Sequence, residues 1–186
     1  IFAGLNQRDA ALAMIGIQTT FVFSDADNKD IRFESQKDCD YIVLHLPFFK
    51  DRMAPPPIIE LYVTSEFLLI LGDSDIIKNL VKELGPLDNA SDSPVYVLSM
   101  LFGYILRQDS GLLEEIDGRI ESLEERSTLR KPEDHSATII ALRKQLLSLK
   151  RYFEALYDLL GELEDNRNNL FSKNQLQLFR VHKNKA

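Results

Sequence analysis

The apolar residues in the second half of the chain recur at the spacing of an amphipathic helix. Between residues 139 and 163 they follow alternating steps of three and four, at Ile139, Leu142, Leu146, Leu149, Phe153, Leu156, Leu160 and Leu163. This unbroken heptad pattern predicts one continuous helix with an apolar stripe along one side. Residues 94–126 show a similar period. We therefore expect the two helices to form an antiparallel hairpin in which the stripe faces its partner.

Two prolines mark the expected beginnings of these helices. Pro94 follows a serine at the end of a polar stretch, and Pro132 lies in the polar break between the two periodic segments. Proline is tolerated in the first turn of a helix because the N–H groups there have no partner within the helix. We therefore expect the first helix to begin at Pro94 and the second at Pro132.

The first 90 residues carry patterns of both strands and helices. Residues 5–16 have helical spacing and end at a glycine, which favours a helix terminus. Residues 41–49 form an apolar run typical of a buried strand. Residues 59–72 predict a β-hairpin that turns near Ser65, and residues 73–85 predict a helix that follows it.

A capping pattern near the end of the chain predicts a third helix there. Ser172 and Gln175 have the spacing of a capping box, and Phe171 and Leu176 are placed for a hydrophobic staple. We interpret residues 170–186 as the beginning of a longer helix that is truncated here.

These elements together predict an α+β fold in three parts. Residues 1–90 are expected to form an α/β domain, residues 91–169 a long helical hairpin, and residues 170–186 the start of the truncated helix.

Composition and charge argue against several classes of function. The 186 residues are 45% hydrophobic and 27% charged, which is typical of a folded globular chain. The formal net charge of -7 argues against nucleic acid as a partner, because such binding depends on clustered Lys and Arg. No apolar run approaches the ~18 to 20 residues that a membrane span needs. The single cysteine fits a reducing compartment.

Signatures of catalysis are missing from the sequence. It contains no glycine-rich phosphate loop, no nucleophile elbow and no paired Cys or His spacing for zinc. The three histidines, His45, His135 and His182, have no potential ligands close to them in the sequence, which is typical of surface or packing roles. We therefore expect that the protein is not an enzyme and that it holds no firmly bound cofactor.

Four carboxylates form a stripe beside the apolar positions of the first long helix, at Glu114, Asp117, Glu121 and Glu124. One interpretation is a solvated face that pairs with basic residues of the antiparallel helix, namely Arg143, Lys144, Lys150 and Arg151. The other is an acidic surface that attracts divalent cations such as magnesium, which prefer carboxylate oxygens. The sequence leaves both interpretations open.

The order of these elements resembles the cytoplasmic region of CorA-type divalent-cation transporters. The stretches that carry the likeness are "DYIVLHLPFF", "SEFLLILGDSDIIKNLVKELG", "LLEEIDGRIESLEE", "LRKQLLSLKRYFEALYDLLGEL" and "LFSKNQLQLFR". The last of these resembles the start of the family's stalk helix, which continues into two membrane spans. Neither span is in this sequence. The resemblance covers nearly the whole chain.

The resemblance implies a regulatory and assembly domain at the cytoplasmic face of the cell membrane. The parent would be a homopentameric transporter for magnesium and related ions such as cobalt, attached to the membrane only through the absent spans. Two alternatives stay open. One is a zinc-transporting member of the same family. The other is a soluble helical-hairpin scaffold that binds a partner protein.

The resemblance also bears on where a regulatory metal would bind. It places the family's two metal-binding aspartates at Phe23 and Val181, and neither side chain can bind a hard cation. Asp25 and Asp27 lie close enough in the sequence to substitute. The resemblance further implies a short helix at residues 19–23, where β propensity alone would favour a strand. The ligand set is therefore left unknown, with these two aspartates and the four carboxylates of the acidic stripe as candidates.

Overall fold

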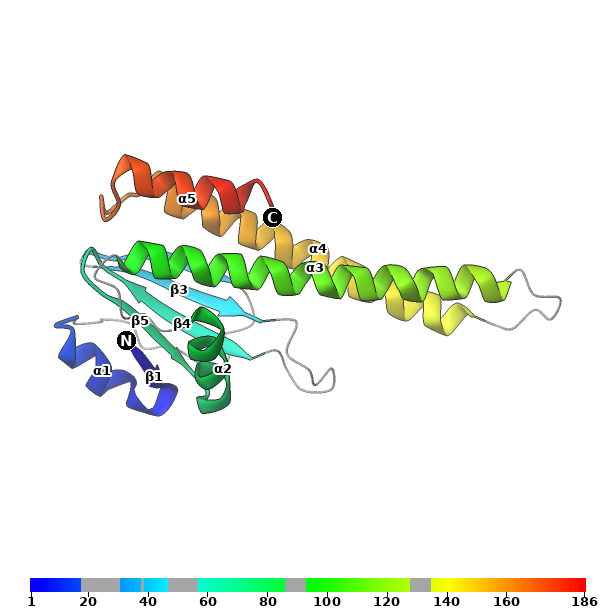
Figure 1. The fold of residues 1–186 in the computed structure, drawn as a ribbon, viewed down its shortest axis with the longest axis horizontal. Coiled ribbons are helices and arrows are strands. Elements are labelled where there is room, and N and C mark those ends of the chain that lie inside the picture. The colour runs from blue at the N-terminus through cyan, green and yellow to red at the C-terminus, as the bar shows by residue number, and fades with distance from the viewer. Residues whose placement is uncertain (18–30, 38, 47–56, 86–92, 128–134) are drawn as a thin grey trace.

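The computed structural model is an α+β fold in which a two-helix arm projects beyond a helix-covered sheet (Figure 1). It describes residues 1–17, 31–37, 39–46, 57–85, 93–127 and 135–186. The predicted short helix at residues 19–23 and the far end of the strand predicted for residues 41–49 lie outside the described residues.

The sheet has five strands in the order β1-β5-β4-β3-β2. Their bounds are Phe2–Gly4 for β1, Arg32–Ser35 for β2, Asp40–His45 for β3, Ile58–Val63 for β4 and Leu68–Gly72 for β5. β1 pairs parallel to β5, and the other neighbours are antiparallel. The predicted hairpin is confirmed as β4 and β5. The edge strands β1 and β2 were not predicted, because they are short and only half-buried.

The three central strands are buried on both faces, since successive residues of a strand point to opposite sides of the sheet. On one face, Tyr41, Tyr62 and Leu71 pack with helix α1 (Arg8–Met14), which follows a short 3-10 turn at Leu5–Gln7. The opposite face is covered by α2 (Ser74–Leu84) and by the first half of α3 (Pro94–Ser127). The predicted helices at residues 5–16 and 73–85 are thus confirmed.

The long helices follow the predicted order. α3 begins at Pro94 as expected, and α4 (Ser136–Asp165) returns antiparallel beside it (Figure 1). The predicted start at Pro132 is wrong, because His135 is the N-cap residue of α4; Pro132 itself lies outside the described residues. α5 (Lys173–Lys183) begins with the predicted capping box, in which the Ser172 N–H donates to Gln175 Oε1 over 2.8 Å.

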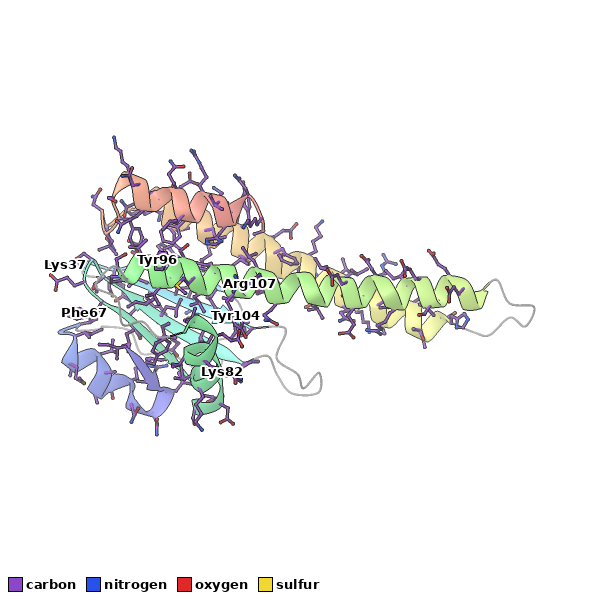
Figure 2. The ribbon with its side chains drawn as sticks, viewed as in Figure 1. Lys37, Phe67, Lys82, Tyr96, Tyr104 and Arg107 are labelled. Carbon is purple, nitrogen blue, oxygen red and sulfur yellow. The ribbon has the colours of Figure 1, made fainter. Side chains whose placement is uncertain are left out.

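One hydrophobic core joins the sheet to α2, α3, α4 and α5. Leu98, Leu101, Phe102 and Ile105 of α3 are fully buried in it, and side chains fill the space between α3 and the sheet (Figure 2). Further along α3, Ile116 contributes instead to a small separate cluster with Leu142 and Leu149 of α4. The arm is therefore a two-helix structure attached to a multilayered base, and the three-part division at residues 90 and 169 stays a prediction.

The heptad stripe of α4 does not face α3 along its whole length, so this part of the prediction is wrong. One set of heptad positions, Leu142, Leu149, Leu156 and Leu163, is buried throughout. The other set changes along the helix, from Ile139 at 56% and Leu146 at 39% exposure, through half-buried Phe153, to fully buried Leu160. A single partner helix covers only one edge of the stripe. The second edge is covered only where the sheet, α3 and α5 surround α4.

This difference between neighbouring heptad positions predicts different tolerance to charge. Leu149→Asp would bury an unpaired carboxylate between α3 and α4, and we expect a loss of about 3 kcal/mol or more in the free energy of unfolding. Leu146→Asp is the matched control, because its side chain reaches solvent, and should cost less than about 1 kcal/mol. Denaturant unfolding of both variants measures the difference. Equal losses would contradict the one-edge packing of the stripe.

Candidate functional site

The acidic stripe lies on the projecting part of α3. Glu114, Asp117, Glu121 and Glu124 are all exposed. Within the described part of the chain, no three His, Cys, Asp or Glu side chains are grouped so that they could hold a metal ion. Exposed carboxylates on one helix face attract cations diffusely but do not surround an ion with several oxygens. The role of these residues as metal ligands stays a prediction.

The other metal candidates lie elsewhere. Asp25 and Asp27 are outside the described residues, as is Phe23. Val181 is on α5 and is 51% exposed. The structure therefore brings none of these positions together with the acidic stripe in its described part.

Two polar contacts lie on the arm next to the acidic stripe. Lys150 makes an ion pair within α4, with Glu154 at 3.7 Å. Between the helices, Arg119 Nη1 donates to Gln145 Oε1 over 2.9 Å. These polar contacts flank the small apolar cluster between α3 and α4.

A site that sequence reasoning missed is the junction where α4 ends and α5 begins. Asn166 and Asn169 both have left-handed backbone angles, with φ of 49° and 53°. Asn166 Nδ2 donates to the Phe171 carbonyl at 2.8 Å, and the Phe171 N–H donates back to Asn166 Oδ1 at 3.1 Å. These reciprocal bonds close the turn, so α5 runs back along α4 (Figure 1).

Asn168 attaches this junction to the sheet. Its side-chain amide donates to the Gln36 carbonyl at 2.6 Å, to Asp40 Oδ1 at 2.8 Å and, more weakly, to the Cys39 carbonyl at 3.3 Å. Burial raises the pKa of Asp40, and the side-chain hydrogen bonds of Ser35 and Asn168 oppose that shift. The start of α5 is therefore fixed to the turn between β2 and β3.

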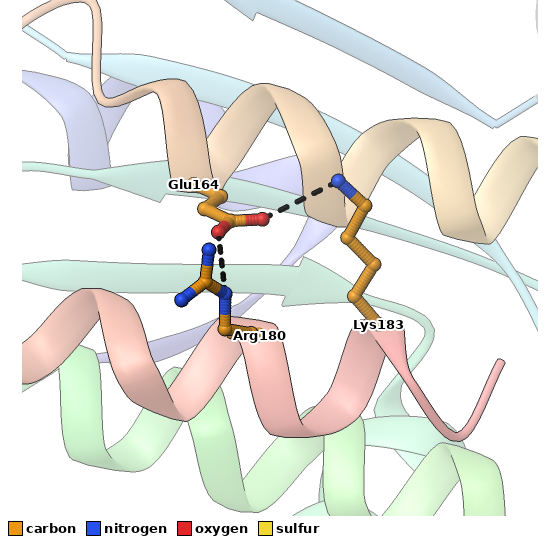
Figure 3. Close-up of polar contacts among 3 residues, drawn as sticks. All are labelled: Glu164, Arg180 and Lys183. Carbon is orange, nitrogen blue, oxygen red and sulfur yellow. Dashed lines mark hydrogen bonds and ion pairs between the residues drawn. The ribbon is translucent and has the colours of Figure 1, made fainter.

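A second set of contacts fixes α5 against α4 further along (Figure 3). Glu164 on α4 pairs with Arg180 Nε at 3.0 Å and with Lys183 Nζ at 3.3 Å. The Lys183 ammonium also lies 5.0 Å from the centre of the Tyr157 ring. A Cβ added at Gly161 would come within 3.2 Å of that ammonium, so the glycine permits its close approach.

Aromatic packing supplies the apolar part of the same interface. Phe179 of α5 is fully buried, with its ring centre 5.1 Å from that of Phe171 and 6.5 Å from that of Phe102 on α3. α5 is thus held by α3 and α4, and the junction that precedes it is attached to the sheet through Asn168.

The sequence does contain a signal for this junction. The run "EDNRNN" at residues 164–169 is rich in asparagine, which tolerates the left-handed conformation better than other residues with a side chain. The contacts of Asn168 and Glu164 could not be predicted from the sequence, because their partners are distant along the chain or depend on how α5 packs.

The chain belongs to the CorA-like Mg2+ transporter protein family, whose model matches residues 19–185. Comparison with curated protein sequences gives no significant match. No helix in the described part of the chain is long and apolar enough to cross a membrane.

Solved structures share the fold at low sequence identity. The soluble domain of CorA from Methanocaldococcus jannaschii matches with a TM-score of 0.71 and 19% identity, covering 95% of this chain and 74% of that one. The ZntB cytoplasmic domain from Vibrio parahaemolyticus RIMD 2210633 gives 0.71 and 15%, covering 99% and 76%. The complete CorA magnesium transporter from M. jannaschii gives 0.74 and 17%, covering 99% of this chain and 61% of that one.

We expect Asn168→Ala to separate the junction from the sheet. It removes the donor shared by the Gln36 carbonyl and Asp40, and should cost about 1–3 kcal/mol in the free energy of unfolding, because both acceptors lie in a partly buried region. Asn174→Ala is the matched control, since Asn174 is exposed in the first turn of α5. Denaturant unfolding distinguishes them, and equal stabilities would argue that Asn168 does not anchor the junction.

Glu164→Gln should loosen α5 by a smaller, salt-dependent amount. Its carboxylate is 24% exposed and pairs with two cations, so we expect a loss of about 1 kcal/mol at low salt that shrinks at about 1 M salt. Glu162→Gln, which breaks the more exposed pair with Arg167, is the control. Hydrogen exchange of α5 amides at both salt concentrations reports the difference. A loss that salt does not change would rule out an electrostatic origin.

Proposed function

We propose that this chain is the regulatory and assembly domain of a divalent-cation transporter, located at the cytoplasmic face of the membrane. Membership of the CorA-like family supports the class. The observation that carries a regulatory role is the attachment of α5 to the sheet through Asn168 and to α4 through Glu164. If α5 begins a stalk helix that leads to a pore, a movement of the sheet would be transmitted to it through these contacts.

The parent protein, in this proposal, is a homopentamer that contacts the membrane only through spans beyond this sequence. The family resemblance supports the pentamer. The chain spans 61% of the length of the complete CorA structure that it matches, which leaves room for such spans in a longer relative. No catalytic step and no nucleic-acid partner belong to the proposal.

Magnesium is the proposed cargo, with cobalt as a related ion, because the family model describes Mg2+ transporters. A zinc-transporting member is the alternative within the family. The ZntB cytoplasmic domain and the CorA soluble domain match this chain with the same TM-score of 0.71. Transport experiments therefore distinguish the two ions.

A second candidate function is a scaffold that binds a partner helix, and one observation favours it. An apolar groove of about 660 Å³ runs along the arm. Its apolar lining is Ile120, Leu123, Ile139, Leu142, Leu146 and Leu147. The exposed heptad positions Ile139 and Leu146 lie in it, and exposed apolar surface of this kind marks interaction sites in soluble proteins.

Transport by the whole reading frame tests the proposed function. Expressed in cells that lack their own magnesium uptake, it should restore growth at low magnesium and carry magnesium or cobalt into the cells. Uptake of zinc alone would identify the zinc-transporting alternative. A reading frame without two apolar runs of about 20 residues after Ala186 would overturn the transporter proposal and favour the scaffold.

For the domain itself we expect only weak magnesium binding, with a dissociation constant in the millimolar range or higher. The exposed carboxylates of α3 build no cage, and magnesium keeps much of its own water. Calorimetric titration with magnesium, repeated with cobalt, measures this. Saturable binding in the micromolar range that is lost in Asp25→Asn or Asp27→Asn would contradict the expectation and locate the metal site near these two aspartates.

A further inference from the structure

His182, in the last turn of α5, makes a polar contact with α3. Its Nε2 lies 2.9 Å from Ser99 Oγ, and its ring centre lies 6.5 Å from that of Phe102. A Cβ added at Gly103 would come within 3.4 Å of the His182 ring, so the missing side chain leaves space for the ring. The ring is therefore inserted into the interface between α3 and α5.

The hydrogen-bonding capacity of this pocket fits a neutral ring. Among the described residues, His182 Nδ1 is buried without a hydrogen-bond partner, while Nε2 lies against Ser99 Oγ. A neutral imidazole carries one N–H, which Ser99 can accept at Nε2. A protonated ring carries two, and the second, at Nδ1, would have no acceptor. Burying such an unpaired donor destabilises the contact.

The surrounding charges also favour the neutral ring. Arg107 lies on α3 (Figure 2), where its guanidinium and the His182 ring both border Gly103, and Lys185 follows His182 along the chain. On α4, Glu164 pairs with Arg180 and Lys183, and Glu154 and Asp158 line a pocket together with Lys185. The pKa of His182 is lowered by burial first and then by Lys185 and Arg107, while a hydrogen bond with the backbone of Ser99 opposes the shift.

We propose that His182 is an acid-sensitive clasp between α5 and α3. With a neutral ring the clasp is closed and α5 lies against α3. Protonation of the ring opens it, because the charge and the second N–H have no partner there. The Glu164 pairs still hold α5 to α4, so α5 changes its contact with α3 without leaving the domain.

The pH range follows from the sign of the shift. The His182 pKa lies below its ordinary value of 6.5 when the clasp is closed. The stabilisation from this contact is therefore complete above pH 6.5, and it decreases as the pH falls through that value towards the lowered one. In the transporter proposed above, α5 begins the stalk, so acidification would loosen the stalk from the sheet-bearing base. That consequence rests on the proposed function, whereas the clasp itself does not.

Histidine NMR titration of the whole chain tests the clasp directly. The resonance of His182, assigned by its loss in His182→Gln, should titrate below 6.5. Arg107→Gln removes an exposed like charge and should raise the pKa of His182. A residue with a purely structural role would not respond to that change. A wild-type His182 that titrates at or above 6.5 would overturn the proposal, whatever the stability of the variants.

Hydrogen exchange tests the consequence for α5. After correction for intrinsic exchange rates, the protection of α5 amides should fall by up to about tenfold per unit of pKa shift as the pH drops below 6.5, while α4 amides near Leu160 keep theirs. His182→Gln should remove this pH dependence, and His135→Gln, at the start of α4, should preserve it. An unchanged pH dependence in His182→Gln would overturn the proposal. Neither measurement uses transport, so a failure of this test is distinguishable from a failure of the proposed function.

Discussion

The fold depends on covering the second face of the sheet. The central strands are apolar on both sides, and α1 covers only one of them. The other face is covered by α2 and by the first half of α3, whose residues Leu98, Phe102 and Ile105 are fully buried. Each side chain of this size contributes about 1.5–3 kcal/mol when it is buried. Because α3 is one continuous helix, this contact also fixes the direction in which the arm projects.

Two kinds of interaction, apolar burial and polar contacts, attach α5 to the rest of the fold. Burial of Phe171 and Phe179 supplies most of the stabilisation, since exposed ion pairs such as Arg180 with Glu164 contribute only about 0–1 kcal/mol each. Apolar contacts tolerate small rotations, however, whereas hydrogen bonds require particular distances and angles. Asn168 and Glu164 therefore contribute more to the orientation of α5 than to its stabilisation. This combination gives α5 a defined angle relative to the sheet.

Side chains of the arm are buried less completely than those beside the sheet, because the arm has only two helices. Where the sheet and α5 surround α4, both edges of its heptad stripe are buried, as at Leu160 and Leu163. Beyond them, α3 alone covers Leu142 and Leu149 and leaves Ile139 exposed. The apolar groove follows directly from this missing third layer. The carboxylates of α3 lie exposed on the same arm and form no metal cage in the described residues.

The sequence by itself determined the elements whose signal is local. The structure confirms the continuous helix through residues 139–163, the Pro94 start, the hairpin near Ser65 and the capping box at Ser172, because periodicity and capping depend on neighbours along the chain. The ordered set of elements also pointed to the CorA-like family, which the family model confirms.

Only the tertiary structure decided which side of each element is covered. The edge strand β2 exists because β3 offers it a free edge, and the exposure of Leu146 depends on the absence of a third helix beside it in the described structure. The contacts of Asn168 with Asp40 and of His182 with Ser99 join residues more than 80 positions apart. No periodicity or motif along the chain encodes such a contact. Its geometry follows from the packing of α3, α4 and α5 around one core.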